Sequence, residues 1–231
     1  MSKKSTKLLD VIVIGAGASG MMAAITAARR GKSVAILERM NKPGKKILAT
    51  GNGKCNFTNN NMDTSRFHGN IQLIQSVLDR FSKEDTLSFF HEIGIWPKEK
   101  NGYYYPNSGQ AVSVVEAFNH ELNRLHVPVY LEQEVLDLFP DKYGFRIKTV
   151  QTSYTCRNVI VASGLLAASK LGSDGSMFSV IKELGHRFVP VLPALCGFYA
   201  KGIPFSKVAG VRCDANLTLK IDGDTAATEH G

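Results

Sequence analysis

The sequence has few cysteines, and their spacing argues against two kinds of site. The four cysteines form no Cys-x-x-Cys pair, and none stands at metal-ligand spacing from a histidine. We therefore predict no metal site and no paired dithiol, and the isolated thiols favour a reducing, cytoplasmic location. A disulfide reductase would need a second cysteine close to Cys55, so we predict an inert, buried thiol at that position.

Long apolar runs, internal repeats and low-complexity tracts are also lacking. A membrane-spanning helix needs about 20 apolar residues, whereas the long apolar stretch 11–28 is interrupted by three glycines. Asp10 separates this stretch from the basic residues before it, which favours a strand and a helix over a secretory leader. The sequence thus predicts no association with a membrane.

Acidic residues are fewer than basic ones. The 231-residue chain has 28 lysines and arginines against 20 aspartates and glutamates, a net charge of +8. Such a charge can reflect an anionic partner, either nucleic acid or a phosphate-rich cofactor. The basic residues are scattered, however, and the tight interior cluster is Lys42, Lys45 and Lys46. We interpret most of the charge as solvated surface and expect no nucleic-acid partner.

Residues 10–38 contain the most informative pattern in the chain. A strand-like run, Asp10–Ile14, leads into Gly15, Gly17 and Gly20, and a second such run ends at Glu38. In dinucleotide-binding folds the first glycine allows a tight turn, the second lets the backbone approach a pyrophosphate, and the third lets helix and strand pack closely. An acidic residue about 20 positions further on accepts hydrogen bonds from a ribose. The pattern predicts dinucleotide binding and leaves NAD and FAD equally open.

The rest of the chain predicts an α/β fold with a mostly parallel sheet. We expect an irregular segment over 39–69, a hairpin over 96–106 that turns at Asn101-Gly102, and a helix that begins after Ser82 with Asp85 in its first turn. Helices are expected over 18–30, 71–81, 83–93, 110–125 and 176–184, and strands over 10–14, 33–38, 127–131, 135–139, 145–150, 153–156, 158–164, 207–213 and 217–221. The strands between 135 and 156 should form a three-stranded antiparallel meander. Helical patterns stop near residue 190, so we expect a first domain over 1–190 and the beginning of a β-rich second domain over 191–231.

Segment 44–59, GKKILATGNGKCNFTN, resembles the signature loop of a flavoprotein family, the YhiN/BaiN-like or aminoacetone-oxidase-like FAD-dependent oxidoreductases. Three further segments, 105–111, 172–175 and 192–195, are similar to motifs of that family and follow in its order. The resemblance implies a Rossmann-like FAD-binding domain within residues 1–190, and so favours FAD over NAD. Members of the family continue beyond this length, so we expect the sequence to be an N-terminal portion.

The resemblance also implies a set of cofactor-binding residues. Glu38 would bind the adenosine ribose, Val135 would contact the adenine through its backbone, and the loop after Gly44 would lie near the ribityl chain and the flavin ring. The turn Ala162-Ser163-Gly164 stands where the family has an Ala-Thr-Gly-like turn. The full set is Gly15, Gly17, Ala18, Ser19, Gly20, Glu38, Arg39, Lys45, Lys46, Thr50, Gly51, Asn52, Gly53, Asn56, Val135, Ala162, Ser163 and Gly164.

The chemistry implied is hydride transfer between the flavin and a small organic substrate. No second Gly-x-Gly-x-x-Gly follows a strand, so a dedicated nicotinamide domain is not predicted. If NAD(P)H reduces the flavin, it would dock transiently at the flavin face; the alternative is direct oxidation of the substrate with oxygen as the acceptor. Lys45 and Lys46 either offset phosphate or reduced-flavin charge or serve solubility. Tyr103 and Tyr105 share one strand face and either line a substrate pocket or pack across strands. No catalytic acid or base is predicted.

Two other hypotheses stay open at this stage. The basic balance and the dinucleotide motif are also compatible with a flavin-binding RNA-modifying protein, which would need a contiguous basic face with aromatic side chains that stack on bases. The chain could also be a non-catalytic fragment that folds around the dinucleotide-binding core without retaining FAD. The sequence does not predict an oligomeric state.

Overall fold

The structure is a computed structural model that describes residues 8–192, 207, 210–211 and 214–230. The chain divides into two compact units, 1–191 and 192–231. The second unit contains an antiparallel hairpin, β10 (Asn216–Ile221) and β11 (Asp224–His230), exposed along its whole length. The predicted strand 217–221 is β10, whereas most of the predicted strand 207–213 lies outside the described residues. Because this hairpin buries no core, the interpretation of 191–231 as the beginning of a second domain stays a prediction.

The first unit is built on a six-stranded sheet with the order β6-β2-β1-β9-β8-β7. β1 pairs in parallel with β2 and β9, and β2 pairs in parallel with β6. β2 is buried along its whole length because helices cover both faces of this part of the sheet. The strands are β1 (Leu9–Ile14), β2 (Val34–Leu37), β6 (Val129–Tyr130), β7 (Val135–Asp141), β8 (Gly144–Thr149) and β9 (Ser153–Val161). The predicted α/β fold with a mostly parallel sheet is confirmed.

The predicted meander is present, but its third strand is longer than expected. The segments 153–156 and 158–164 were expected as two strands and form one, β9. Its first half pairs antiparallel with β8, and its second half pairs in parallel with β1. Cys156 sits at the overlap, paired with both Phe145 and Leu9. The meander therefore extends the main sheet, a continuity that local sequence patterns do not reveal.

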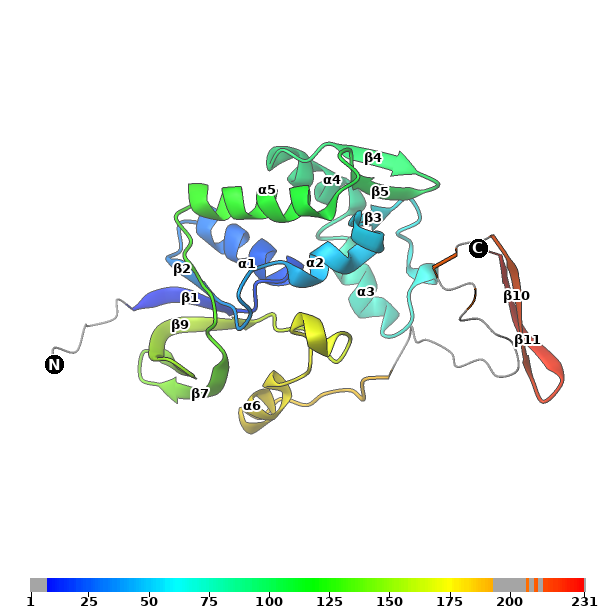
Figure 1. Cartoon of the computed structure of the whole chain (residues 1–231). Coiled ribbons are helices and arrows are strands. Elements are labelled where there is room, and N and C mark those ends of the chain that lie inside the picture. Colours follow the sequence, from blue (N-terminus) through cyan, green and yellow to red (C-terminus); the bar gives the residue numbers. More distant parts are fainter. Residues whose placement is uncertain (1–7, 193–206, 208–209, 212–213, 231) are drawn as a thin grey trace. The chain divides into compact units, whose positions relative to one another are not determined.

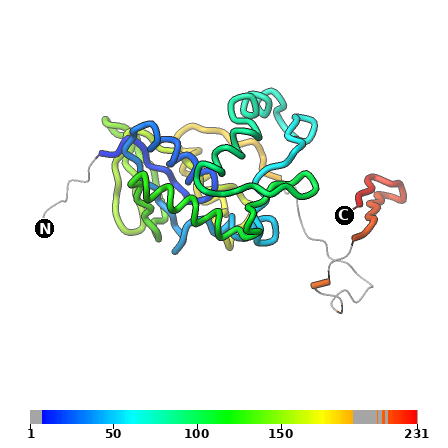
Figure 2. The backbone as a smooth tube through the Cα atoms, turned by 90° about the horizontal axis from the view of Figure 1, so that it is seen from above, coloured from blue at the N-terminus to red at the C-terminus, as the bar shows by residue number. Residues whose placement is uncertain are grey.

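Helices pack on both faces of the sheet (Figure 1). On one face α1 (Ala18–Arg29) and α5 (Ala111–Arg124) bury an apolar cluster that includes Met21, Ile25 and Phe118. On the other face α6 (Met177–Glu183) packs with the opposite side of β1 and with β7 and β8. Figures 1 and 2 place the β7–β8 hairpin and the β4–β5 hairpin at opposite ends of the first unit.

The segment 39–69, predicted to be irregular, contains regular structure. It forms a helix, α2 (Lys45–Ala49), a strand, β3 (Thr58–Asn59), and two 3₁₀ turns over Thr50–Gly53 and Thr64–Arg66. Gly44 begins α2 with a left-handed φ of 70°, and Ile47 of α2 is buried in the core beside α5. The helix depends on this tertiary packing, because five residues are too few to form a stable helix alone.

The segments between β3 and α5 follow the predictions closely. Helices α3 (Ile71–Leu78) and α4 (Lys83–Glu92) form as expected, and Ser82 and Asp85 make the predicted reciprocal cap of α4. β4 (Pro97–Lys100) and β5 (Tyr103–Pro106) turn at Asn101-Gly102, where both residues have positive φ. β3, β5 and β4 form a small antiparallel sheet, and a further 3₁₀ turn covers Ser169–Leu171.

Candidate functional site

The turn between β1 and α1 has a separate physical requirement at each of its glycines. Gly15 has a φ of +102°, and a Cβ there would lie 2.6 Å from the carbonyl oxygen of Ala162. A Cβ on Gly20 would lie 1.9 Å from the carbonyl oxygen of Gly15. At Gly17, in contrast, a Cβ would meet nothing within 4 Å. Gly15 and Gly20 are therefore needed by the fold itself, whereas the space beside Gly17 is open to a ligand.

Helix α1 begins beside this open space without a side-chain cap. Its N-cap residue, Gly17, has no side chain to accept from the first N–H groups of the helix, and no side-chain cap is formed. Those N–H groups and the positive end of the helix dipole favour an anion at this position. The local geometry is thus suited to a phosphate.

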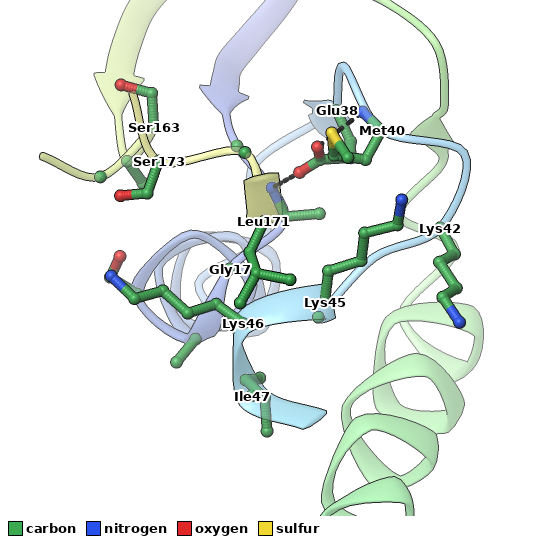
Figure 3. Close-up of a pocket in the computed structure, with 18 of the residues that line it drawn as sticks. Gly17, Glu38, Met40, Lys42, Lys45, Lys46, Ile47, Ser163, Leu171 and Ser173 are labelled. Atoms are coloured by element: carbon green, nitrogen blue, oxygen red, sulfur yellow. Dashed lines mark hydrogen bonds between the residues drawn. The ribbon is translucent and has the colours of Figure 1, made fainter. Parts of the chain in front are cut away.

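Glu38 is held rigidly at the end of β2. Its carboxylate accepts hydrogen bonds from the backbone N–H of Ala16 (2.6 Å) and the backbone N–H of Met40 (2.8 Å), and the residue is only 9% exposed. These bonds fix the side chain beside the glycine turn (Figure 3). A carboxylate offers about four acceptor positions, so the two oxygens keep capacity for further donors, such as ribose hydroxyls.

A cavity of about 340 Å³ opens in front of the glycine turn. In the view of Figure 3, Lys45 lies on the side of Glu38, and Lys46 lies on the side of Ser163 and Ser173. The three lysines of the interior cluster all line this cavity, with one carboxylate, which gives it a positive electrostatic character. The lining residues are Gly15, Ala16, Gly17, Ala18, Ser19, Glu38, Met40, Lys42, Gly44, Lys45, Lys46, Ile47, Thr50, Ala162, Ser163, Gly164, Leu171, Gly172 and Ser173.

Several lining residues were not among the predicted site residues. Leu171, Gly172 and Ser173 reach the cavity because the backbone at Gly164 lies against Ser173: a Cβ on Gly164 would lie 2.3 Å from the Ser173 hydroxyl oxygen. The Ser173 hydroxyl donates to the carbonyl of Leu165 (2.8 Å). The similarity of segment 172–175 to a family motif was a signal for this part of the cavity. Ala16 and Met40 flank predicted residues and carried no separate signal. Lys42 belongs to the basic cluster noted in the sequence, and Gly44 and Ile47 belong to segment 44–59, whose family resemblance was the signal for them.

A smaller cavity of about 40 Å³ adjoins the first cavity, and the predicted residues Arg39 and Val135 line it. The two cavities share Gly15, Glu38, Ser163 and Gly172. Arg39 is held there by Asp174, at 2.8 Å between guanidinium nitrogen and carboxylate oxygen. The hydrogen bond from Arg39 lowers the pKa of the Asp174 carboxyl to about 2. This pair ties the segment after β2 to the segment before α6.

We expect Asp174→Asn to lower the melting temperature at pH 7 and to have a much smaller effect near pH 2, where the wild-type carboxyl is about half protonated. The folded-state pKa of Asp174 is depressed, to about 2 from 3.8, so its stabilising contribution is present above about pH 4 and is lost as the pH falls through 2. Because Asp174 is 34% exposed in its side chain, we expect only about 0.5–1 kcal/mol at pH 7. Thermal melts of both proteins over this pH range measure the difference, with Asp141→Asn as the exposed control. An equal difference at pH 7 and pH 2 would contradict the assignment.

The predicted loop residues divide between two environments. Thr50 lines both the first cavity and a second, mostly apolar cavity of about 370 Å³, and Asn56 lines the second cavity alone. Gly51, Asn52 and Gly53 line neither; they form a tight left-handed turn with φ of 53°, 55° and 79°. The structure therefore does not bring these three residues to the cavity wall. Gly20 also does not line the cavity and serves the packing of α1 on β1.

The apolar cavity adjoins the first cavity on the side of α2. It shares Ala18, Ser19, Ile47 and Thr50 with that cavity. Its walls carry five phenylalanines, and its other lining residues include Cys55 and Asn56; the phenylalanines are Phe57, Phe81, Phe89, Phe90 and Phe118. The three cavities thus form a continuous row from Val135, past the glycine turn, to this aromatic wall.

Cys55 faces the apolar cavity as a thiol of low reactivity. It is only 7% exposed, and burial raises its pKa, although a hydrogen bond with Thr50 acts in the opposite direction. A raised pKa disfavours the nucleophilic thiolate. The predicted burial of Cys55 is confirmed. Within the described part of the chain, no group of three or more His, Cys, Asp or Glu side chains could hold a metal ion.

The sheet, the glycine turn and the carboxylate of Glu38 together define a dinucleotide-binding Rossmann domain. The chain belongs to the HI0933-like family, because residues 9–223 match the family described as "HI0933-like protein Rossmann domain". The family membership inferred from segment 44–59 is thereby confirmed.

Curated relatives carry two different activities in their names. A "3-dehydro-bile acid delta(4,6)-reductase" of Clostridium scindens is 42% identical over 222 residues, which cover 95% of this chain and 54% of that protein. A "ribosomal RNA dihydrouridine synthase" of Escherichia coli is 29% identical over 191 residues, covering 82% of this chain and 48% of that protein. The chain therefore spans about half the length of the curated relatives it matches.

Similarity to solved structures supports the fold. An open-conformation flavocytochrome c3 fumarate reductase has a TM-score of 0.61 and 15% identity, covering 78% of this chain and 41% of that chain. At this identity the likeness concerns the fold alone. Every helix in the described residues is too short or too polar to span a bilayer.

Proposed function

We propose that this chain is the FAD-binding portion of a flavin-dependent oxidoreductase. The observation that carries the proposal is the row of three cavities, in which the open space beside Gly17 lies between Glu38 and the aromatic wall. An extended dinucleotide needs such a row, because its adenine, its phosphates and its second ring system require different chemical surroundings. The match to a reductase over 95% of the chain supports the same function.

The residues present match the chemistry of FAD from its adenosine ribose to its pyrophosphate. The adenine would lie near Val135 and Arg39, the ribose hydroxyls would donate to Glu38, and the pyrophosphate would accept from the N–H groups at the beginning of α1. Lys45 and Lys46 would offset the phosphate charge from the opposite wall. The predicted residues from Thr50 to Asn56 would lie toward the flavin end. There the tight turn at Gly51 determines the backbone direction of the loop.

A bound flavin supplies hydride transfer, and the chain supplies binding, orientation and exclusion of water. The backbone bonds to Glu38 hold the ribose acceptor in place before the cofactor arrives. The aromatic wall near Phe57 and Phe90 excludes water from the flavin end, which strengthens nearby electrostatic interactions. None of the residues described takes the role of a catalytic acid or base in this proposal.

The proposed substrate is a small apolar molecule with a reducible double bond, and NAD(P)H is the proposed reductant. The support is the apolar cavity beside the flavin end, with a volume of about 370 Å³, together with the bile-acid substrate in the name of the 42% identical relative. RNA is the second candidate substrate, favoured by the relative named as a ribosomal RNA dihydrouridine synthase. To distinguish the two candidates, the reduced protein is offered either an enone steroid or a uridine-containing RNA. The compound that reoxidises the flavin is the substrate.

FAD titration of the 231-residue chain tests the proposal, with Gly17→Val as the critical variant. A valine side chain would occupy the space where nothing lies within 4 Å, so the fold should persist while FAD binds on the order of 100-fold more weakly, equivalent to about 2.8 kcal/mol. Flavin fluorescence gives the affinity, and thermal melting gives the fold. Failure of the wild-type chain to bind FAD, or equal binding by Gly17→Val, would contradict the proposal.

A further inference from the structure

The β4–β5 hairpin gathers two lysines and two tyrosines on one of its faces. In the register of the hairpin Lys98 is opposite Tyr105, and Lys100 is opposite Tyr103. Residues directly opposite each other in an antiparallel pair point to the same face, and neighbours along a strand alternate. Glu99, the acidic residue of β4, therefore points to the other face. The face of the two lysines and two tyrosines is basic and aromatic.

This face forms one wall of a cleft of about 530 Å³, separate from the row of three cavities. Lys54 and the loop 107–109 complete it. None of its lining residues is acidic, and its three lysines take part in none of the ion pairs formed among the described residues. The lining residues are Lys54, Lys98, Lys100, Asn101, Tyr103, Tyr105, Pro106, Asn107, Ser108 and Gly109.

The cleft borders the loop that we assign to the flavin end. The ring of Tyr105 lies 3.6 Å from the place where a Cβ on Gly51 would stand, and Lys54 directly follows the tight turn 50–53. Helix α5 begins at Ala111, two residues beyond the cleft, and its N-cap Gln110 makes no side-chain cap. The positive end of this 14-residue helix adds to the attraction of the lysines for an anion.

We propose that this cleft binds a free phosphorylated nicotinamide dinucleotide of the NADPH type. Its phosphates are matched by three lysines that form no ion pair within the described part of the chain, and the faces of Tyr103 and Tyr105 offer stacking surfaces for its rings. A cleft of bounded volume suits a free dinucleotide, whereas a long RNA strand would call for basic residues that continue over the surface. That the bound nucleotide donates a hydride to the flavin rests on the proposed function. That the nucleotide binds in this cleft does not rest on it.

Calorimetric titration of NADPH into the 231-residue chain, with FAD in excess to fill the first cavity, tests the proposal. We expect Lys100→Gln and Tyr103→Ala each to weaken NADPH binding about tenfold, the loss of one phosphate pair or one stacked ring. Tyr103→Phe should retain affinity, because it keeps the stacking face. NADH, which lacks one phosphate, should bind more weakly than NADPH, and added salt should weaken both.

Matched variants separate this proposal from the function of the first cavity. Lys148→Gln and Tyr143→Ala change exposed residues far along the sequence from the cleft and should leave NADPH binding unchanged. The cleft variants should leave FAD affinity and melting temperature unchanged. Absence of NADPH binding, or equal binding by wild type and both cleft variants, would overturn the cleft assignment even where FAD binds. Displacement of NADPH by a tighter-binding single-stranded RNA would overturn the assignment to a free dinucleotide.

Discussion

Replacing Gly20 by alanine is expected to destabilise the folded chain by about 3 kcal/mol, at the upper end of the usual range for overpacking. The added Cβ would lie 1.9 Å from the carbonyl oxygen of Gly15 and 3.3 Å from the Cβ of Ala162, so backbone must move. Alanine favours a helix over glycine by only about 1 kcal/mol, too little to offset this clash. For a domain of this size we expect the melting temperature to fall by about 10 °C.

The control for this prediction is Gly17→Ala, three residues earlier in the same motif. Gly17 has a negative φ of −79° and open space around its missing Cβ, so alanine should change the melting temperature by only a few degrees. Thermal denaturation followed by circular dichroism compares the two variants with the wild type. Equal melting temperatures for Gly20→Ala and Gly17→Ala would show that α1 does not pack on β1 as closely as described.

Glu38→Gln is expected to reduce both the stability of the chain and its affinity for FAD. The carboxylate accepts from two backbone N–H groups, at Ala16 and Met40. An amide side chain can accept only one of these bonds and directs its own NH₂ at the other N–H, which costs about 1–3 kcal/mol for the unsatisfied buried donor. Loss of charge-assisted bonds to the ribose should weaken FAD binding by roughly 10- to 100-fold in addition.

Two measurements separate these effects. Thermal melts without cofactor report the lost backbone bonds, and FAD titrations well below the melting temperature report the lost ribose contacts. Glu183→Gln, an exposed carboxylate on α6, serves as the control and should change neither quantity. A variant that melts early but binds FAD as tightly as the wild type would restrict Glu38 to a structural role.

Much of the fold was predictable because its signals are local. The strands β1 and β2 are short apolar runs, Ser82 and Asp85 mark the beginning of α4, and Asn101-Gly102 sets the hairpin turn. Each of these features depends on residues within a few positions of one another. Helix α2 was missed for the opposite reason: it is too short to show a helical period, and it is held by packing of Ile47 in the core.

The candidate site was only partly predictable. The glycine turn and Glu38 follow from spacing along one strand–helix–strand unit, and most of the predicted residues line the row of cavities. Gly51, Asn52 and Gly53 were assigned to the cofactor through family resemblance, yet they shape the loop without lining the cavities. Their role in binding FAD stays a prediction.

The sequence by itself determined the strand–turn–helix geometry, the acceptor at Glu38 and the family, because glycine spacing and apolar period act over short distances along the chain. Only the tertiary structure decided which distant segments complete the site. The pairing of Arg39 with Asp174 joins residues 135 positions apart, and Leu171 to Ser173 reach the cavity through the turn after β9. The lysine–tyrosine cleft likewise arises from strand register, where side chains from two strands and a separate loop meet in space.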